Sequence, residues 1–101
     1  MRIRNFKDAV EDARGVILTF AGQTVTDDDC VSDVRAAIAK LDAAIDGALM
    51  RARPTELDPG DRLRVELCAK ELVLLWDKCG TKSQALILDM KTLFGRYIEL
   101  P

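Results

Sequence analysis

The residues that most often carry catalysis are sparse in this chain. It has no histidine, which removes the commonest general base and the commonest neutral metal ligand. The segment Gly80-Thr81-Lys82-Ser83 looks like the end of a phosphate-binding loop, but that motif requires a glycine where the chain has Leu75. We therefore interpret this segment as the end of one helix followed by the start of the next.

Acidic and thiol side chains gather at residues 27–30. Asp27, Asp28 and Asp29 offer the oxygen ligands that divalent cations prefer, but the spacing of an EF-hand loop is absent. Cys30 lies near a predicted helix N-terminus, which favours a thiolate, yet three aspartates precede it and no histidine can deprotonate it. We expect a helix start here, and we expect no catalytic residues, no metal site and no cofactor in the chain. It is not predicted to be an enzyme.

Size and composition indicate one small globular domain spanning residues 1–101. Hydrophobic residues make up 49% of the 101 positions and charged residues 32%, which is typical of a folded protein rather than a disordered one. The net charge of −2 gives no overall field that would attract nucleic acid or anionic lipid. Three cysteines are too few for a disulfide scaffold, and the start of the chain does not look like a signal peptide. We expect a cytoplasmic protein with no membrane span.

Four stretches open on the same pattern, in which a capping residue is followed three positions later by an acid or amide. The pairs are Asn5 with Asp8, Thr26 with Asp29, Asp58 with Asp61, and Thr81 with Gln84. They predict helices at residues 6–21, 27–52, 59–79 and 82–94, and whether the last continues past Gly95 is left open. Because every connection is short, the fold predicted is an all-α, antiparallel up-down-up-down four-helix bundle.

Each predicted helix carries apolar residues in alternating steps of three and four, which is typical of a helix with one buried side. The expected core includes Val10, Ile17, Val34, Leu41, Val65, Leu72, Leu86, Met90 and Leu93, with Trp76, Phe94 and Tyr97 as its aromatic residues. In the predicted helix at residues 59–79, we expect Asp58 to accept a hydrogen bond from the Asp61 backbone. Gly80 should close that helix in a left-handed conformation.

The predicted helix at residues 59–79 has a second apolar side. Leu63, Leu67 and Leu74 form a ridge that is flanked by charged residues, namely Lys70 on one side and Arg64 and Glu71 on the other. A helix with two apolar sides is either central to its own fold or half-buried by a partner. The first alternative is that another helix of the chain covers the ridge. The second predicts a non-enzymatic protein–protein interaction module (an inhibitor, adaptor or assembly chaperone), with homodimerisation as its simplest use.

Four arginines gather around the predicted loop at residues 53–58: Arg51, Arg53, Arg62 and Arg64. Together they form a basic patch that could meet an acidic partner or phosphates. The plainer interpretation is that two of them complement the end of the preceding helix, while Glu56, Asp58 and Asp61 neutralise the others.

The alternative function is a DNA-binding regulator. Residues 72–93 could form a helix-turn-helix, with Gly80-Thr81 as the turn and Lys82 at the start of the recognition helix. Two observations argue against it. Trp76 stands where close helix contact favours a small residue, and the chain is acidic overall.

Overall fold

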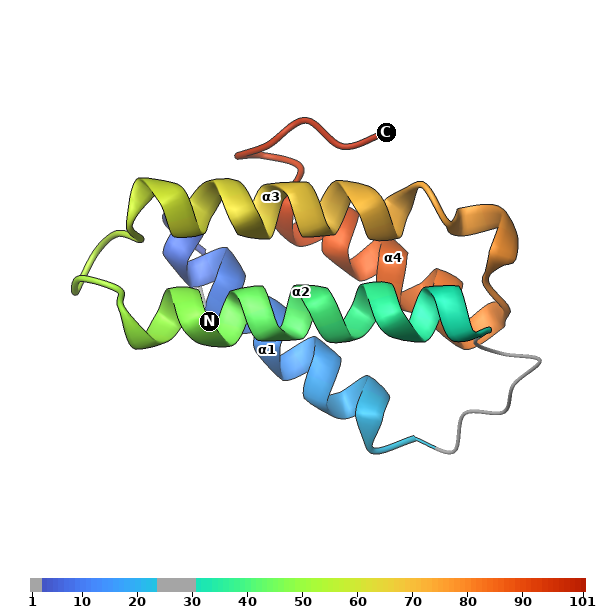
Figure 1. Ribbon diagram of the computed structural model, residues 1–101. Coiled ribbons are helices and arrows are strands. Elements are labelled where there is room, and N and C mark those ends of the chain that lie inside the picture. The colour runs from blue at the N-terminus through green and yellow to red at the C-terminus, as the bar shows by residue number, and fades with distance from the viewer. Residues whose placement is uncertain (1–2, 24–30) are drawn as a thin grey trace.

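Four α-helices make up most of the computed structural model, which describes residues 3–23 and 31–101 (Figure 1). They are α1 (Phe6–Ala21), α2 (Ser32–Met50), α3 (Pro59–Val73) and α4 (Thr81–Phe94), and a short 3₁₀ helix, η1 (Trp76–Lys78), lies between the last two. The predicted all-α class and small four-helix bundle are therefore confirmed.

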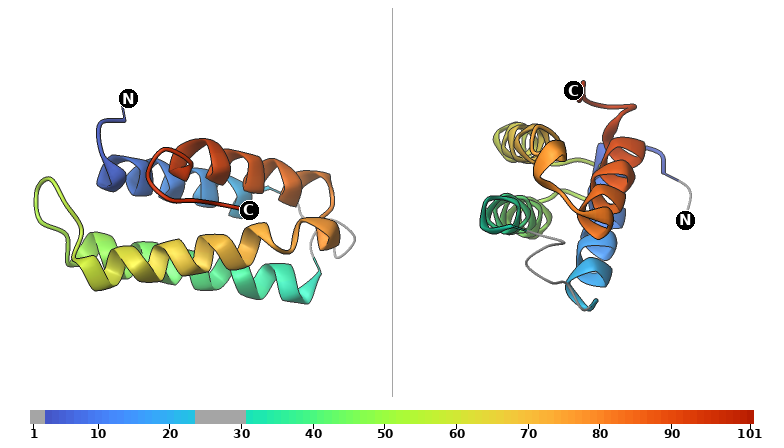
Figure 2. Two further views of the ribbon diagram at one scale, coloured as in Figure 1. Left: turned by 90° about the horizontal axis from the view of Figure 1, so that it is seen from above. Right: turned by 90° about the vertical axis from the view of Figure 1, so that its right-hand side faces the viewer.

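The helices are arranged in two layers of two. α2 packs mainly against α3, and α1 packs mainly against α4 and also contacts α2. Figure 2 shows the α2–α3 pair on one side of the molecule and the α1–α4 pair on the other. The two helices of each pair run in opposite directions, and the α1–α4 pair crosses the α2–α3 pair obliquely (Figure 1). The core lies between the layers.

Small side chains let the helices approach closely. α2 buries Ala37, Ala44 and Ala48, and α3 buries Ala69, so little side-chain bulk separates their backbones. The larger predicted core residues are also buried: Val10, Ile17, Val34, Leu41, Val65, Leu72, Leu86 and Met90. The predicted core is thus largely confirmed, although Leu93 is only partly buried.

An aromatic group closes one end of the core. The rings of Phe6 and Phe94 lie 5.6 Å apart in a tilted arrangement, and Tyr97 stands edge-on to Phe6 at 6.1 Å. Phe94 is fully buried and Tyr97 partly so. Such aromatic pairs stabilise a fold by more than the burial of their surface alone, and here they join the start of the chain to its end.

The helix starts follow the predicted caps only in part. Asn5 Oδ1 accepts a hydrogen bond from Asp8 N at 2.9 Å, as predicted. The carboxylate of Asp58 accepts from Gly60 N at 3.1 Å, one position earlier than expected. α4 begins at Thr81 itself, so its N-cap is Gly80, which has no side chain to accept a hydrogen bond.

The bounds of α2 also differ from the prediction. The pair Thr26 with Asp29 and the predicted start at residue 27 lie outside the described residues. Val31 has an extended backbone and is the N-cap of α2, and the helix ends at Met50 rather than at residue 52.

The helix predicted over residues 59–79 is shorter, because α3 ends at Val73. The next residues form tighter hydrogen bonds from residue i+3 to residue i, such as Leu75 N to Leu72 O at 3.0 Å and Lys78 N to Leu75 O at 2.8 Å. Five consecutive apolar residues at 72–76 cover every side of an α-helix, so a continuous helix cannot bury them all. The change in geometry leaves Trp76 36% exposed instead of placing it in the core.

Two glycines, Gly80 and Gly95, lie at the ends of α4. Gly80 has an extended backbone (φ −82°, ψ −175°), so the predicted left-handed cap is wrong. α4 ends at Phe94 and does not continue past Gly95. A Cβ atom at Gly95 would lie 2.6 Å from Lys91 O, so only glycine fits this turn without a shift of the backbone.

The glycine inside α1 generates a stability prediction. A Cβ atom at Gly15 would meet nothing within 4 Å, so Gly15→Ala gains helix propensity without a steric cost. We expect the free energy of unfolding to rise by about 0.5–1 kcal/mol, measured by urea denaturation.

Gly47→Ala in α2 is the matched control. Its Cβ would lie 2.9 Å from Arg51 Nη2, so the arginine must move and the gain should be smaller or absent. Equal gains at the two positions would contradict this description of the two sites.

Candidate interaction surface

The outer side of α3 carries the ridge that the sequence predicted. The exposed fractions of Leu63, Leu67 and Leu74 are 54%, 56% and 70%. Val65, Ala69 and Leu72 lie on the opposite side of the same helix and are fully buried. The described part of the chain therefore leaves the three leucines, which we call the outer ridge, open to solvent. Neither α1 nor α4 covers it, which removes the first of the two alternatives.

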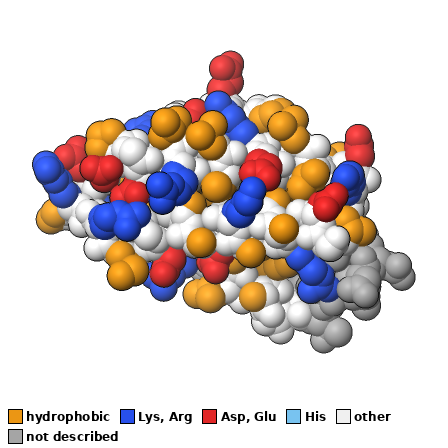
Figure 3. Space-filling model, viewed as in Figure 1, with side chains coloured by type: hydrophobic (Ala, Val, Ile, Leu, Met, Phe, Trp, Pro, Cys, Tyr) orange, Lys and Arg blue, Asp and Glu red, His pale blue; other side chains and the backbone are white. Residues whose placement is uncertain are grey.

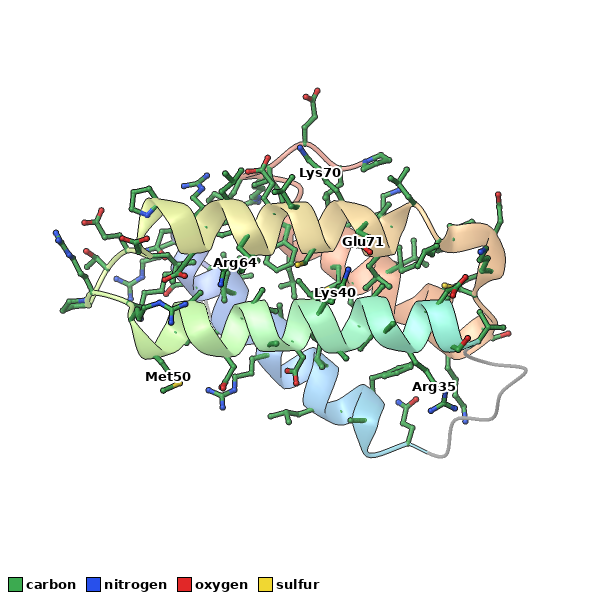
Figure 4. All side chains as sticks on the ribbon, viewed as in Figure 1. Arg35, Lys40, Met50, Arg64, Lys70 and Glu71 are labelled. Carbon is green, nitrogen blue, oxygen red and sulfur yellow. The ribbon has the colours of Figure 1, made fainter. Side chains whose placement is uncertain are left out.

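Charged residues border the outer ridge on both sides. Lys70 lies between Leu67 and Leu74 along the helix, and it forms an ion pair with Glu66 at 3.2 Å. Glu71 forms an exposed ion pair with Lys40 of α2 at 3.4 Å. Figure 4 shows Arg64, Glu71 and Lys40 over the junction of α2 and α3, with Lys70 at the other edge of α3. Hydrophobic side chains are interspersed with positively and negatively charged side chains across this face (Figure 3).

Three of the four arginines of the predicted basic patch have separate partners. Arg53 lies 3.8 Å from Glu56 in an exposed ion pair. Arg62 donates to Tyr97 O at 3.2 Å and places its guanidinium 4.7 Å from the centre of the Phe6 ring. Arg64 borders the outer ridge. The structure therefore does not bring these side chains together around one open site.

Arg51 joins α2 to α3 through the strongest of these interactions. Its Nε and Nη2 atoms donate to the two carboxylate oxygens of Asp61 at 2.9 and 2.7 Å. The Asp61 side chain is only 8% exposed. The hydrogen bonds from Arg51 hold the pKa of Asp61 below its ordinary value, and although burial opposes this shift, it does not reverse it. The pairing raises the pKa of Arg51, so both groups remain charged and the pair is a structural clamp.

Two cysteines, Cys68 and Cys79, lie in the described part of the chain, and both are partly buried. Burial, followed by the nearby charge of Glu71, raises the pKa of the half-buried Cys68 thiol, which disfavours the thiolate. Within residues 3–23 and 31–101, no three Cys, Asp or Glu side chains are placed to hold a metal ion. The sequence candidates Cys30, Asp27, Asp28 and Asp29 lie outside the described residues.

The segment predicted as a helix-turn-helix has a different geometry. Residues 74–80 separate α3 from α4 and include η1, so Gly80-Thr81 is not a tight turn between two long helices. α4 packs mainly on α1 and makes few contacts with α3. In its first turn, Ser83 is buried rather than available to a base edge.

Sequence reasoning missed a groove between α1 and α4. Gly15 and Ala85 are small residues on its two walls, and the apolar side chains of Phe20 and Leu86 also line it. The available signal was Gly15, whose lack of a side chain in mid-helix is unfavourable unless space is needed there.

Comparison of the chain with protein-family models, curated proteins and solved structures gives no match. None of the helices in the described part of the chain combines the length and the apolar character needed to cross a bilayer.

The clamp predicts how stability depends on pH. Because the pKa of Asp61 is lower in the folded state than its ordinary value of 3.8, its ion pair stabilises the fold fully at higher pH. That contribution is lost as the pH falls below about 5 and through the folded-state pKa. We expect Asp61→Asn to flatten the acid limb of a plot of unfolding free energy against pH, measured by denaturant unfolding.

Asp46→Asn is the control, since Asp46 pairs with Arg14 on the exposed surface at 3.1 Å. This variant should keep the wild-type profile. A wild-type acid limb in Asp61→Asn would show that the clamp does not contribute to stability in this way.

Proposed function

We propose that this chain is a protein–protein interaction module that acts through the outer ridge, and that a second copy of the chain is its simplest partner. The observation that carries the proposal is the alignment of Leu63, Leu67 and Leu74, each more than half exposed, along one side of α3 and its C-cap residue. Contiguous exposed apolar surface on a small protein marks an interaction site more often than a scattered exposed leucine does. Leu18 and Leu88, by contrast, are exposed singly on α1 and α4.

The spacing of the ridge suits an antiparallel pair of α3 helices. Leu63, Leu67, Lys70 and Leu74 follow one another at intervals of four, three and four residues, as in a coiled-coil seam. In the antiparallel arrangement, Leu63 faces Leu74 of the second copy, and Leu67 faces Lys70. The lysine can cover that leucine with its aliphatic stem while its ammonium group stays near Glu66.

The charges beside the ridge favour this direction over the parallel one. In the antiparallel register, Arg64 lies opposite Glu71 of the second copy, and the two-fold axis repeats the pair. In a parallel register, Glu66 would instead lie beside Glu71 of the second copy, which places two like charges together. Arg64 forms no ion pair within the described residues, so its charge is available to a partner.

The size of the ridge sets the expected affinity. Burying the exposed half of one leucine contributes about 1 kcal/mol or somewhat more, so six leucines contribute roughly 6–9 kcal/mol. Association costs about 4–15 kcal/mol in lost freedom, which offsets most of this gain. Even the most favourable of these values leave a net gain of only about 5 kcal/mol, so a dimer held by the ridge alone has a Kd of roughly hundreds of micromolar at best. A different protein that adds contacts around the ridge would bind more tightly.

Removal of the ridge should abolish self-association. We expect the wild-type protein to show a rise in average mass between about 50 µM and 1 mM in sedimentation experiments. Leu67→Glu/Leu74→Glu should remain monomeric over that range with unchanged helical content in circular dichroism, because it places charges in the proposed contact. Leu18→Glu/Leu88→Glu removes two leucines elsewhere that are also more than half exposed, and it should associate like the wild type.

The orientation can be checked in the same assay by exchanging charges. Arg64→Glu and Glu71→Arg should each weaken association, since each places like charges opposite one another. The double variant Arg64→Glu/Glu71→Arg should restore it. A double variant as monomeric as the single ones would exclude the antiparallel register. In the experiment on the leucines, unfolding of Leu67→Glu/Leu74→Glu would show that the ridge belongs to the core.

A further inference from the structure

The groove between α1 and α4 forms a second concave surface on the bundle. It encloses about 700 Å³, and all of the residues that line it come from the α1 and α4 side of the molecule or their immediate ends. On the other side of α1, Arg14 forms an ion pair with Asp46 of α2. The groove therefore opens away from the α2–α3 pair, and its residues are not those of the outer ridge.

The shape of the groove results from small side chains on its walls. A Cβ atom at Gly15 would meet nothing within 4 Å, and Ala85 on the opposite wall is exposed. Between them, Phe20 is partly buried and Leu86 is buried, so the floor is apolar. An apolar floor between two helices is the kind of site that accepts the apolar side of a third helix.

Two carboxylates and one ammonium group line the groove. Asp12 and Asp89 lie on α1 and α4, and Lys82, which has an interaction of its own, lies in the first turn of α4. Neither carboxylate forms a hydrogen bond or an ion pair in the described structure, whereas Asp33, Asp46 and Asp61 each hold a basic side chain. Two unpaired carboxylates beside an apolar floor match a partner that carries Lys or Arg next to its apolar side.

We propose that this groove binds a cationic amphipathic helix from another protein. The lining residues of α4 extend from Thr81 to Leu93, which corresponds to about 18 Å, or roughly three turns of a partner helix. Its apolar side chains rest on Phe20 and Leu86, and its basic side chains reach Asp12 and Asp89. The proposal does not rest on the outer ridge. If both surfaces are used, the chain connects two partners as an adaptor.

Two synthetic peptides of about fourteen residues test the proposal with wild-type protein. Both are amphipathic helices with the same leucine pattern, and one carries lysine and the other glutamate at its polar positions. Titration is followed by amide chemical shifts in ¹H–¹⁵N spectra. We expect the Leu/Lys peptide to shift the signals of Gly15 and Ala85, and to bind at least about fivefold more tightly than the Leu/Glu peptide.

Variants separate the groove from general attraction to an acidic protein. Asp12→Asn/Asp89→Asn should remove most of the preference for lysine. Gly15→Leu fills the groove and should weaken binding of the Leu/Lys peptide, whereas Gly15→Ala should preserve it. Absence of binding, equal binding of the two peptides, or shifts confined to α3 would overturn the proposal. Loss of self-association by ridge variants bears only on the outer ridge, so the two proposals can fail separately.

Discussion

In this two-layer bundle α3 lies at the outside and turns only one side towards the core. Val65, Ala69 and Leu72 fill it completely, and the alanines of α2 bring the two backbones close together. Leu63, Leu67 and Leu74 are therefore left on the opposite side, facing water. The exposed ridge is thus a direct result of how the core is packed.

The clamp between Arg51 and Asp61 fixes the pair of helices that displays the ridge. It joins the end of α2 to the first turn of α3, and buried Leu57 anchors the loop between them. A bidentate arginine–carboxylate pair restricts both distance and orientation, so the outer side of α3 is presented by a firmly held hairpin. The α1–α4 pair forms the other layer and carries a groove with two unpaired carboxylates. One small bundle thus offers two chemically different faces.

Local sequence signals predicted the parts of the fold that depend on local interactions. The bounds of α1 follow from the cap at Asn5, and the buried side of each helix follows from the spacing of its apolar residues. The end of α3 was not predictable in this way, because the run at residues 72–76 is helical in pattern but apolar on every side. Which of those residues are buried is decided by the other helices.

For the candidate sites too, residue spacing predicted one part and the packing of the helices decided the rest. The spacing of Leu63, Leu67 and Leu74 identified the ridge, but only the packing of the layers shows that no other described helix covers it. The groove depends on which sides α1 and α4 turn outwards, and Asp12 and Asp89 are far apart in the sequence. The four arginines are close in sequence, yet Arg51, Arg53 and Arg62 have separate partners and Arg64 has none among the described residues.

The exposure of the ridge can be measured directly through its methyl groups. A soluble gadolinium chelate broadens the signals of leucine methyls that contact solvent. In dilute protein, the methyls of Leu63, Leu67 and Leu74 should broaden strongly while those of Leu72 do not, and the ridge methyls should become protected as the protein concentration rises. Ridge methyls that are protected in dilute protein, or that stay accessible at every concentration, would contradict the central claim that α3 presents a free apolar side to a second copy of the chain.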